Sequence, residues 1–229
     1  MMDLKANHDE VLSRIGAAAG RSERAAASVT CVAVGKTFPA DVIVRAAEAG
    51  LKDLGESRAQ ELKEKYAVLG DRVRWHFVGH LQTNKVRYVA GIATLIHSVD
   101  RYGVAEAIAR RARSVGKTQQ VLVEVNVARE SAKHGADPAQ AIALAQEVDE
   151  LEGIEVKGLM TMAPFSEDPE EARPYFRELA DLSQVLIAQL PGAAELSMGM
   201  TRDFEVAVEE GATIVRVGEA IFGPRHRSL

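Results

Sequence analysis

Lys36 is the first residue whose type and position could do chemistry, because it follows an apolar, β-branched run. The stretch Thr30–Phe38, TCVAVGKTF, contains the Gly-Lys-Thr that ends a nucleotide-binding P-loop. A P-loop also needs a glycine five residues before the glycine of that triplet, and Thr30 stands there instead. The sequence therefore predicts a lysine at the end of a strand. Partial desolvation there favours the neutral, nucleophilic amine, which can bond covalently to a carbonyl compound. A solvated lysine at a strand edge is the alternative.

Two later segments place small residues where a ligand could approach the backbone. They are SMGMT at 197–201 and RVGE at 216–219. Gly199 and Gly218 permit a close approach, and Thr201 could add a hydroxyl donor for a phosphate. Alternatively, these glycines only shape turns. Together with Lys36, the segments describe a ligand with a carbonyl group at one end and a phosphate at the other, and pyridoxal 5′-phosphate is the common cofactor of that kind.

Arg216 precedes Gly218 by two residues, so both lie on one face of a strand. An arginine beside a pyridine nitrogen keeps that nitrogen unprotonated, because the guanidinium itself is always charged. A neutral ring is a poorer electron sink than a pyridinium, which limits carbanion chemistry. The alternative for Arg216 is an ion pair with Asp203, Glu209 or Glu219.

The histidines and the single cysteine give weaker signals. His76 and His80 span a strand and its loop, and no Cys-x-x-Cys or His-Glu-x-x-His pattern occurs, so we predict no metal site. Cys31 lies inside an apolar run, which predicts a packed thiol. One cysteine cannot form an internal disulfide and is typical of a reducing compartment, so we expect a cytoplasmic protein.

Composition limits the class of protein. The 229 residues are 47% hydrophobic and 27% charged, with a formal net charge of −5. This predicts one globular domain, residues 1–229, without a basic surface for nucleic acid. We expect no signal peptide and no membrane span.

Eight short apolar segments alternate with helical patterns, which predicts parallel βα units. The segments are 30–36, 53–57, 75–79, 94–100, 120–127, 156–162, 195–200 and 213–219. Eight units in a chain of this length favour a single α/β domain, a (β/α)₈ TIM-type barrel, whose active site lies at the carboxyl ends of the strands. A doubly wound open sheet is the alternative. Residues 1–29 are predicted to form an extra N-terminal helix and a polar linker, with Leu4, Val11, Leu12 and Ile15 on one apolar stripe, and residues 30–229 the barrel.

The chain resembles the YggS/PROSC-type pyridoxal phosphate homeostasis proteins, whose fold is similar to the N-terminal domain of alanine racemase. The resemblance covers nearly the whole chain, from about Val32 to Arg225. Its most specific carriers are HFVGHLQTNK, LSMGMTRDF and VRVGEAIFG, supported by VAVGKTF and GESRAQE.

The resemblance implies roles for particular residues. Lys36 would form the Schiff base with pyridoxal phosphate, and Arg216 would face the ring nitrogen. The remaining implied cofactor-binding residues are Ser57, Ser197, Met200, Thr201, Gly218 and Glu219, with the HLQTNK segment lining the same mouth. The family usually has Asn at Ser57 and Thr at Glu219. Since a carboxylate would repel a phosphate, we expect only the Glu219 N–H to contribute.

Two functions are compatible with such a site. A racemase needs a second base opposite Lys36, and none of the four tyrosines falls on a predicted strand end. We also expect no covering second domain. The resemblance instead implies a non-catalytic carrier in vitamin B6 homeostasis, which buffers pyridoxal phosphate or delivers it to apo-enzymes. We expect a monomer, and an amino-acid racemase is the alternative.

Overall fold

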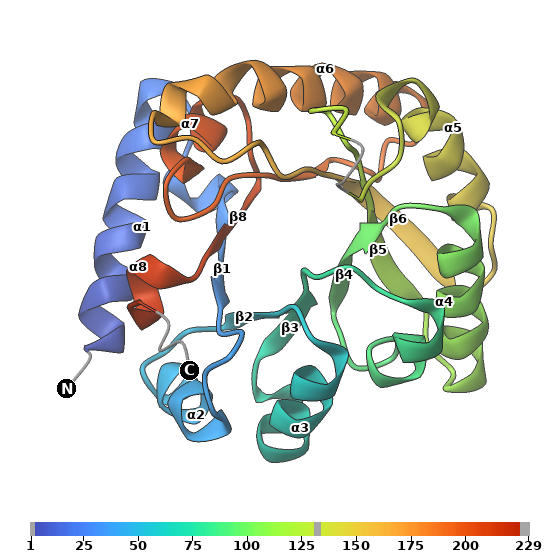
Figure 1. The fold of residues 1–229 in the computed structure, drawn as a ribbon, viewed down its shortest axis with the longest axis horizontal. Coiled ribbons are helices and arrows are strands. Elements are labelled where there is room, and N and C mark those ends of the chain that lie inside the picture. The colour runs from blue at the N-terminus through green and yellow to red at the C-terminus, as the bar shows by residue number, and fades with distance from the viewer. Residues whose placement is uncertain (1–2, 131–133, 225–229) are drawn as a thin grey trace.

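The computed structural model describes residues 3–130 and 134–224. Its eight parallel strands close into a barrel in chain order, β1 to β8 (Figure 1). The strands are β1 Thr30–Val34, β2 Asp53–Glu56, β3 Arg74–Phe77, β4 Leu95–Val99, β5 Gln119–Glu124, β6 Ile154–Met160, β7 Glu195–Ser197 and β8 Ile214–Val217. The predicted (β/α)₈ barrel is confirmed, and the open sheet is wrong because β1 pairs with both β2 and β8.

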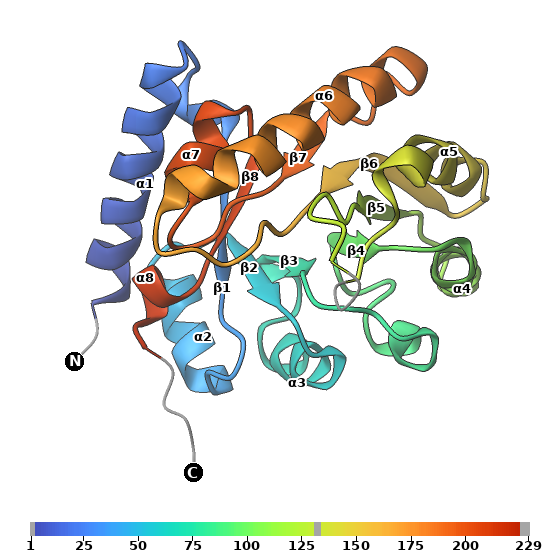
Figure 2. The same cartoon turned by 45° about the horizontal axis from the view of Figure 1, so that its top comes forward.

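Helices surround this barrel on its outer side (Figures 1 and 2). They are α1 Leu4–Arg21, α2 Ala40–Glu48, α3 Ala59–Leu69, α4 Tyr102–Ser114, α5 Pro138–Asp149, α6 Arg173–Gln189, α7 Phe204–Glu209 and α8 Glu219–Phe222. Short 3₁₀ turns add η1 Ala26–Ser28, η2 Gly70–Arg72, η3 Thr83–Tyr88 and η4 Pro169–Ala172. Between β3 and β4 the connection contains η3 and no α-helix.

Two of the helix starts follow from their Asp-Pro sequences. Asp137 caps α5, since its carboxylate accepts a hydrogen bond from the Ala139 N–H at 2.8 Å. Asp168 caps η4 in the same way, and α6 begins directly after that turn. Proline fits the first turn of a helix because its missing N–H has no partner there.

The N-terminal helix α1 is longer than predicted and continues into the expected linker as far as Arg21. The small alanines Ala18 and Ala19 permit this, since they are good helix formers and both are buried. Leu12, expected on the apolar stripe, is 41% exposed. It lies about 80° around the helix from Leu4, at about 100° per residue, which turns it away from the barrel.

Side chains along β1 alternate between two apolar regions. On β1, Cys31 and Ala33 pack toward the helices, whereas Val32 and Val34 belong to a separate cluster with Leu122 and other residues inside the barrel. This alternation is the period of two that a strand imposes. Positions of the second kind therefore face the barrel interior and, at the strand ends, its mouth.

Helix α1 closes the barrel surface beside β1 and β8, where it packs against α7 and α8 (Figure 2). Asn7 donates a hydrogen bond to the Ile221 carbonyl at 2.9 Å, and the Arg14 guanidinium contacts the Glu205 carboxylate at 2.8 Å. Among the helices of the described ranges, none is long and apolar enough to cross a membrane.

Candidate cofactor-binding site

Lys36 lies in the loop after β1, because this strand ends at Val34, two residues earlier than predicted. It keeps the inward alternation of Val32 and Val34, and it lines a cavity at the carboxyl ends of the strands. The buried ammonium of Lys65 donates a hydrogen bond to the Gly35 carbonyl at 3.0 Å, which fixes the peptide that precedes Lys36.

The next residue, Thr37, has a φ of 72°, a left-handed conformation that a threonine rarely adopts. Its N–H donates a hydrogen bond to Glu61 Oε2 at 2.9 Å. Lys65 also forms a buried ion pair with Glu56 at the end of β2, and burial raises the pKa of Glu56 while the Lys65 charge opposes that rise. Helix α3, which carries Glu61 and Lys65, therefore holds the turn that positions Lys36.

The cavity has a volume of about 280 Å³ and takes its lining from both ends of the chain. Its lining residues are Val34, Lys36, Phe38, Val78, Met162, Ala163, Pro164, Phe165, Ser166, Asp168, Pro169, Ala172, Met200, Thr201, Arg202, Asp203, Arg216, Gly218, Glu219 and Gly223. Six of the predicted site residues thus meet in one cavity. Ser57, Ser197 and the segment 80–85 do not line it.

Arg216 brings a buried positive charge to this cavity from β8, the strand that pairs with β1. Its Nη1 donates a hydrogen bond to Ser197 Oγ at 2.6 Å and its Nη2 to the Thr161 carbonyl at 2.8 Å. These hydrogen bonds take the place of the ion pairs that the sequence left open as an alternative. Burial lowers the pKa of Arg216 to about 10, an effect that the charges of Glu124 and Asp203 oppose.

Ser197 lies beneath Arg216 and begins a chain of buried polar groups inside the barrel. Its Oγ is 2.9 Å from His97 Nδ1, His97 Nε2 is 3.0 Å from His76 Nδ1, and His76 Nε2 is 3.1 Å from Asp53 Oδ1. The chain therefore crosses the barrel from the cavity at its carboxyl end to Asp53 at the start of β2. We call these five residues the Arg216–Asp53 chain.

The direction of the hydrogen bonds in this chain follows from donor counting. Arg216 can only donate, and burial lowers the pKa of His97 well below its usual range, so His97 is neutral. An arrangement that satisfies every contact then has Ser197 O–H donating to His97 Nδ1, His97 Nε2–H to His76 Nδ1, and His76 Nε2–H to Asp53. Although burial opposes it, hydrogen bonds from His76 and Arg74 lower the pKa of Asp53, which keeps the last acceptor ionised.

The segments after β7 and β8 supply the small residues that were predicted for a phosphate. Gly199 has a φ of 89°, and a Cβ there would come within 2.5 Å of the Ala207 Cβ. A Cβ on Gly218 would lie 3.1 Å from the Val34 carbonyl oxygen. The Gly218 N–H points to Thr201 Oγ1 at 3.4 Å, whereas the Met200 N–H already donates to Asp203 Oδ1 at 2.6 Å.

Ser57 lies in the loop after β2, where it packs against Gly79 in the loop after β3. A side chain at Gly79 would collide with the Ser57 backbone. This contact brings the two loops together beside the cavity rather than aiming the Ser57 side chain into it.

Sequence reasoning missed Glu124, which ends β5 and is 3% exposed. Burial and the charge of Asp100 raise the pKa of Glu124 to about 7, and the charge of Arg216 opposes that rise. A glutamate that interrupts the apolar run QVLVEVNV was the available signal. His97, in TLIHSVD, was missed as well; it is a buried polar residue that follows the apolar Leu95 and Ile96 in β4.

Comparisons with known proteins identify the family of this chain. The family "Alanine racemase, N-terminal domain" matches residues 13–226. A pyridoxal phosphate homeostasis protein of Aquifex aeolicus is 46% identical over 217 residues, which cover 94% of this chain and 95% of that protein. The structure of PipY of Synechococcus elongatus with pyridoxal phosphate bound has a TM-score of 0.79 and 35% identity, and it covers 93% of this chain and 100% of PipY.

More distant structures share the fold alone. Alanine racemase of Clostridium difficile has a TM-score of 0.67 at 17% identity, and the match covers 88% of this chain and 53% of that enzyme. The family match and the full-length similarity to the Aquifex protein place the chain within one group. It belongs to the alanine racemase N-terminal domain family and, within that family, to the pyridoxal phosphate homeostasis proteins.

Proposed function

We propose that this protein binds pyridoxal 5′-phosphate in the cavity at the carboxyl ends of the strands and serves as a carrier in vitamin B6 homeostasis. The observation that supports it best is that Lys36 and Arg216, from the neighbouring strands β1 and β8, line the same cavity as the glycine-containing segments after β7 and β8. A cavity of about 280 Å³ suits a ligand of this size.

Each end of the cavity suits one part of the cofactor. When bound, pyridoxal phosphate supplies an aldehyde carbon that bonds to an amine and a conjugated ring that accepts electrons. Lys36 would hold the aldehyde end covalently, and Arg216 would interact with the ring nitrogen through a guanidinium that is buried from water. The Arg216–Asp53 chain fixes the orientation of that guanidinium.

The phosphate end is served by Thr201 and by the N–H groups of Gly218 and Glu219. The Met200 N–H contributes only if Asp203 releases it, since the Asp203 carboxylate accepts its hydrogen bond. Burial raises the pKa of Asp203, and the hydrogen bond from the Met200 N–H opposes that rise. Ser197 acts through Arg216, and Ser57 acts through the packing of its loop.

A carrier rather than a racemase is supported by the residues that surround Lys36. Among the described residues that line the cavity, none is a tyrosine or a histidine, the side chains most suited to abstract a proton opposite a lysine. The rim instead exposes the apolar side chains Met162, Phe165 and Met200, of which Phe165 is 76% exposed. An apolar rim suits contact with an apo-enzyme that receives the cofactor. We also propose a cytoplasmic monomer, which fits the buried, unreactive Cys31.

Borohydride reduction of the cofactor-loaded protein tests the cofactor site directly. We expect visible absorbance from the purified protein, and a mass increase on the Lys36 peptide after reduction. Lys36→Ala should abolish both signals, whereas Lys52→Ala, at an exposed lysine outside the cavity, should keep them. An unchanged spectrum in Lys36→Ala would show that the anchor is elsewhere.

Two activity measurements separate the carrier from the alternative. The loaded protein should activate an apo-enzyme that uses pyridoxal phosphate, and Phe165→Ser should slow that activation without loss of the absorbance. Turnover of L-alanine or another amino acid at ordinary enzyme rates, lost in Lys36→Ala, would instead establish a racemase or a related catalyst.

A further inference from the structure

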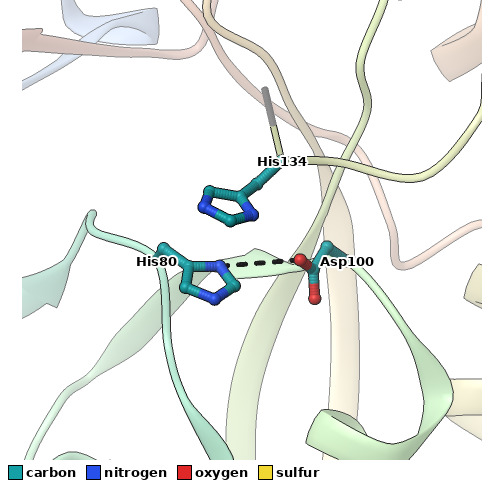
Figure 3. A group of neighbouring side chains, drawn as sticks. All are labelled: His80, Asp100 and His134. Atoms are coloured by element: carbon teal, nitrogen blue, oxygen red, sulfur yellow. Dashed lines mark ion pairs between the residues drawn. The ribbon is translucent and has the colours of Figure 1, made fainter. Parts of the chain in front are cut away.

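His80, Asp100 and His134 form a second cluster of chemically active side chains at the carboxyl end of the barrel. His80 follows β3, Asp100 follows β4, and His134 lies between β5 and α5. Figure 3 shows the His80 ring beside the Asp100 carboxylate, with the His134 ring over it. One nitrogen or oxygen atom from each residue lies within 4.8 Å of the other two, and none of the three residues lines the cavity of Lys36.

The distance between His80 and Asp100 is the first informative measurement. His80 Nδ1 is 3.6 Å from Asp100 Oδ2, which is too long for a hydrogen bond. Zinc–nitrogen and zinc–oxygen distances are about 2.0–2.2 Å, so two ligand atoms of one tetrahedral zinc lie roughly 3.3–3.6 Å apart. The observed gap therefore matches the separation expected of two atoms that share a metal ion.

The hydrogen bonding of the cluster is the second measurement. His80 Nδ1 is buried and has no hydrogen-bond partner among the described residues. Such a polar atom is destabilising unless something satisfies it. Asp100 is held by Arg101, whose Nη1 donates to Asp100 Oδ1 at 2.6 Å and leaves Oδ2 directed at His80. The carboxylate is thus oriented by a group outside the cluster, as metal-binding carboxylates are.

The third residue of the cluster is His134, whose ring is stacked on that of His80. The rings of His80 and His134 are stacked with centroids 3.6 Å apart and planes inclined by 12°. Ring-nitrogen lone pairs lie in the ring plane, so His134 must turn for both rings to face one ion, and its exposed position leaves room for that rotation.

We propose that His80, Asp100 and His134 bind one zinc-type divalent transition-metal ion, with water in the fourth position. Two imidazoles and a carboxylate are a ligand set that zinc accepts, and three protein ligands leave one position open. The bound ion would cross-link the loops after β3, β4 and β5. The proposal does not depend on the cofactor in the neighbouring cavity.

Calorimetric titration of the full-length protein with zinc chloride tests the site. It is carried out on the cofactor-free and the cofactor-loaded protein, because free pyridoxal phosphate can also bind metal ions. We expect one zinc per chain in both forms. His80→Ala, His134→Ala and Asp100→Asn should each weaken that binding by at least about tenfold. His8→Ala is the matched control, since this half-buried histidine lies on α1 and should leave the binding unchanged.

Thermal unfolding with and without zinc provides the second readout. Zinc should raise the Tm of the wild type but not that of His134→Ala. Because His134 is exposed, this variant should match the wild type in the absence of metal, so loss of binding is separable from loss of fold. Failure to bind one equivalent, or equal affinities of the wild type, His80→Ala and His134→Ala, would overturn the proposal.

Discussion

Replacement of Ser197 by alanine tests whether the Arg216–Asp53 chain holds the fold and the cofactor site together. The change removes the acceptor of the 2.6 Å hydrogen bond from Arg216 and the donor to His97. A hydrogen bond to a charged group contributes about 1.5–3 kcal/mol, and a buried acceptor left without a partner costs at least about 1 kcal/mol. Ser197 itself is fully buried, so water cannot replace the hydroxyl from outside. We therefore expect Ser197→Ala to lower the free energy of unfolding by about 3 kcal/mol.

Ser98→Ala is a matched control on strand β4 of the same barrel. Ser98 is buried like Ser197, but its hydroxyl has no hydrogen-bond partner among the described residues, so its removal should not destabilise the protein. For a chain of this size, 3 kcal/mol corresponds to a fall in Tm of roughly 6–12 °C. Calorimetry or circular dichroism of the three proteins gives the comparison. If Ser197→Ala and Ser98→Ala melt within about 1 °C of each other, the chain does not carry the stability that we assign to it.

Three further predictions concern buried ionisable side chains. Burial raises the pKa of Glu124 to about 7, so ionisation of this carboxyl destabilises the folded protein as the pH rises from about 4.5 to 7. Glu124→Gln should therefore raise the Tm at pH 8 and make the Tm depend less on pH. An unchanged Tm at pH 8 would contradict this prediction. The folded pKa of His97 lies below the unfolded value of about 6.5, so its contribution to stability is complete above pH 6.5 and is lost as pH falls, by up to about 1.4 kcal/mol per unit. Melting curves of wild type and His97→Gln between pH 5.5 and 7.5 should show a smaller pH slope in the variant; equal slopes would exclude His97 as the cause. Lys65→Met should cost about 3–5 kcal/mol because it leaves the buried Glu56 charge without its partner, and Glu56→Leu in the same protein should recover most of that loss in denaturant titrations. A double variant no more stable than Lys65→Met would show that the loss is not electrostatic.

The strand pattern predicted the barrel because it depends on features that a single sequence displays. The run TCVAVGK is apolar between Thr30 and Lys36, and TIVRVGE is apolar between Thr213 and Glu219 except at Arg216, as is typical of strands buried on both faces. Their ends were less predictable: β1 stops at Val34 instead of residue 36, and β7 stops at Ser197 instead of residue 200. A strand ends where its hydrogen bonds to the neighbouring strands end, and the sequence of the strand itself does not show where that is.

The sequence predicted which strand-end residues would lie close together. Lys36, Arg216 and Gly218 meet in the cavity, as their positions at strand ends predicted. The Arg216–Asp53 chain was not predictable, because its members come from β2, β3, β4, β7 and β8 and touch only after the barrel has closed. The same holds for the cluster of His80, Asp100 and His134, whose spacing along the chain matches no metal-binding motif.

The Arg216–Asp53 chain also changes how substitutions at the two ends of this barrel should be interpreted. In barrel enzymes, the catalytic residues usually lie at the carboxyl ends of the strands, and residues at the amino ends contribute to stability. Asp53 lies at the amino end, beside Arg74, yet four hydrogen bonds connect it to the guanidinium in the cavity. Selection of stabilising substitutions near Asp53 would therefore also change ligand binding at the opposite end of the barrel, although the substituted residues do not contact the ligand.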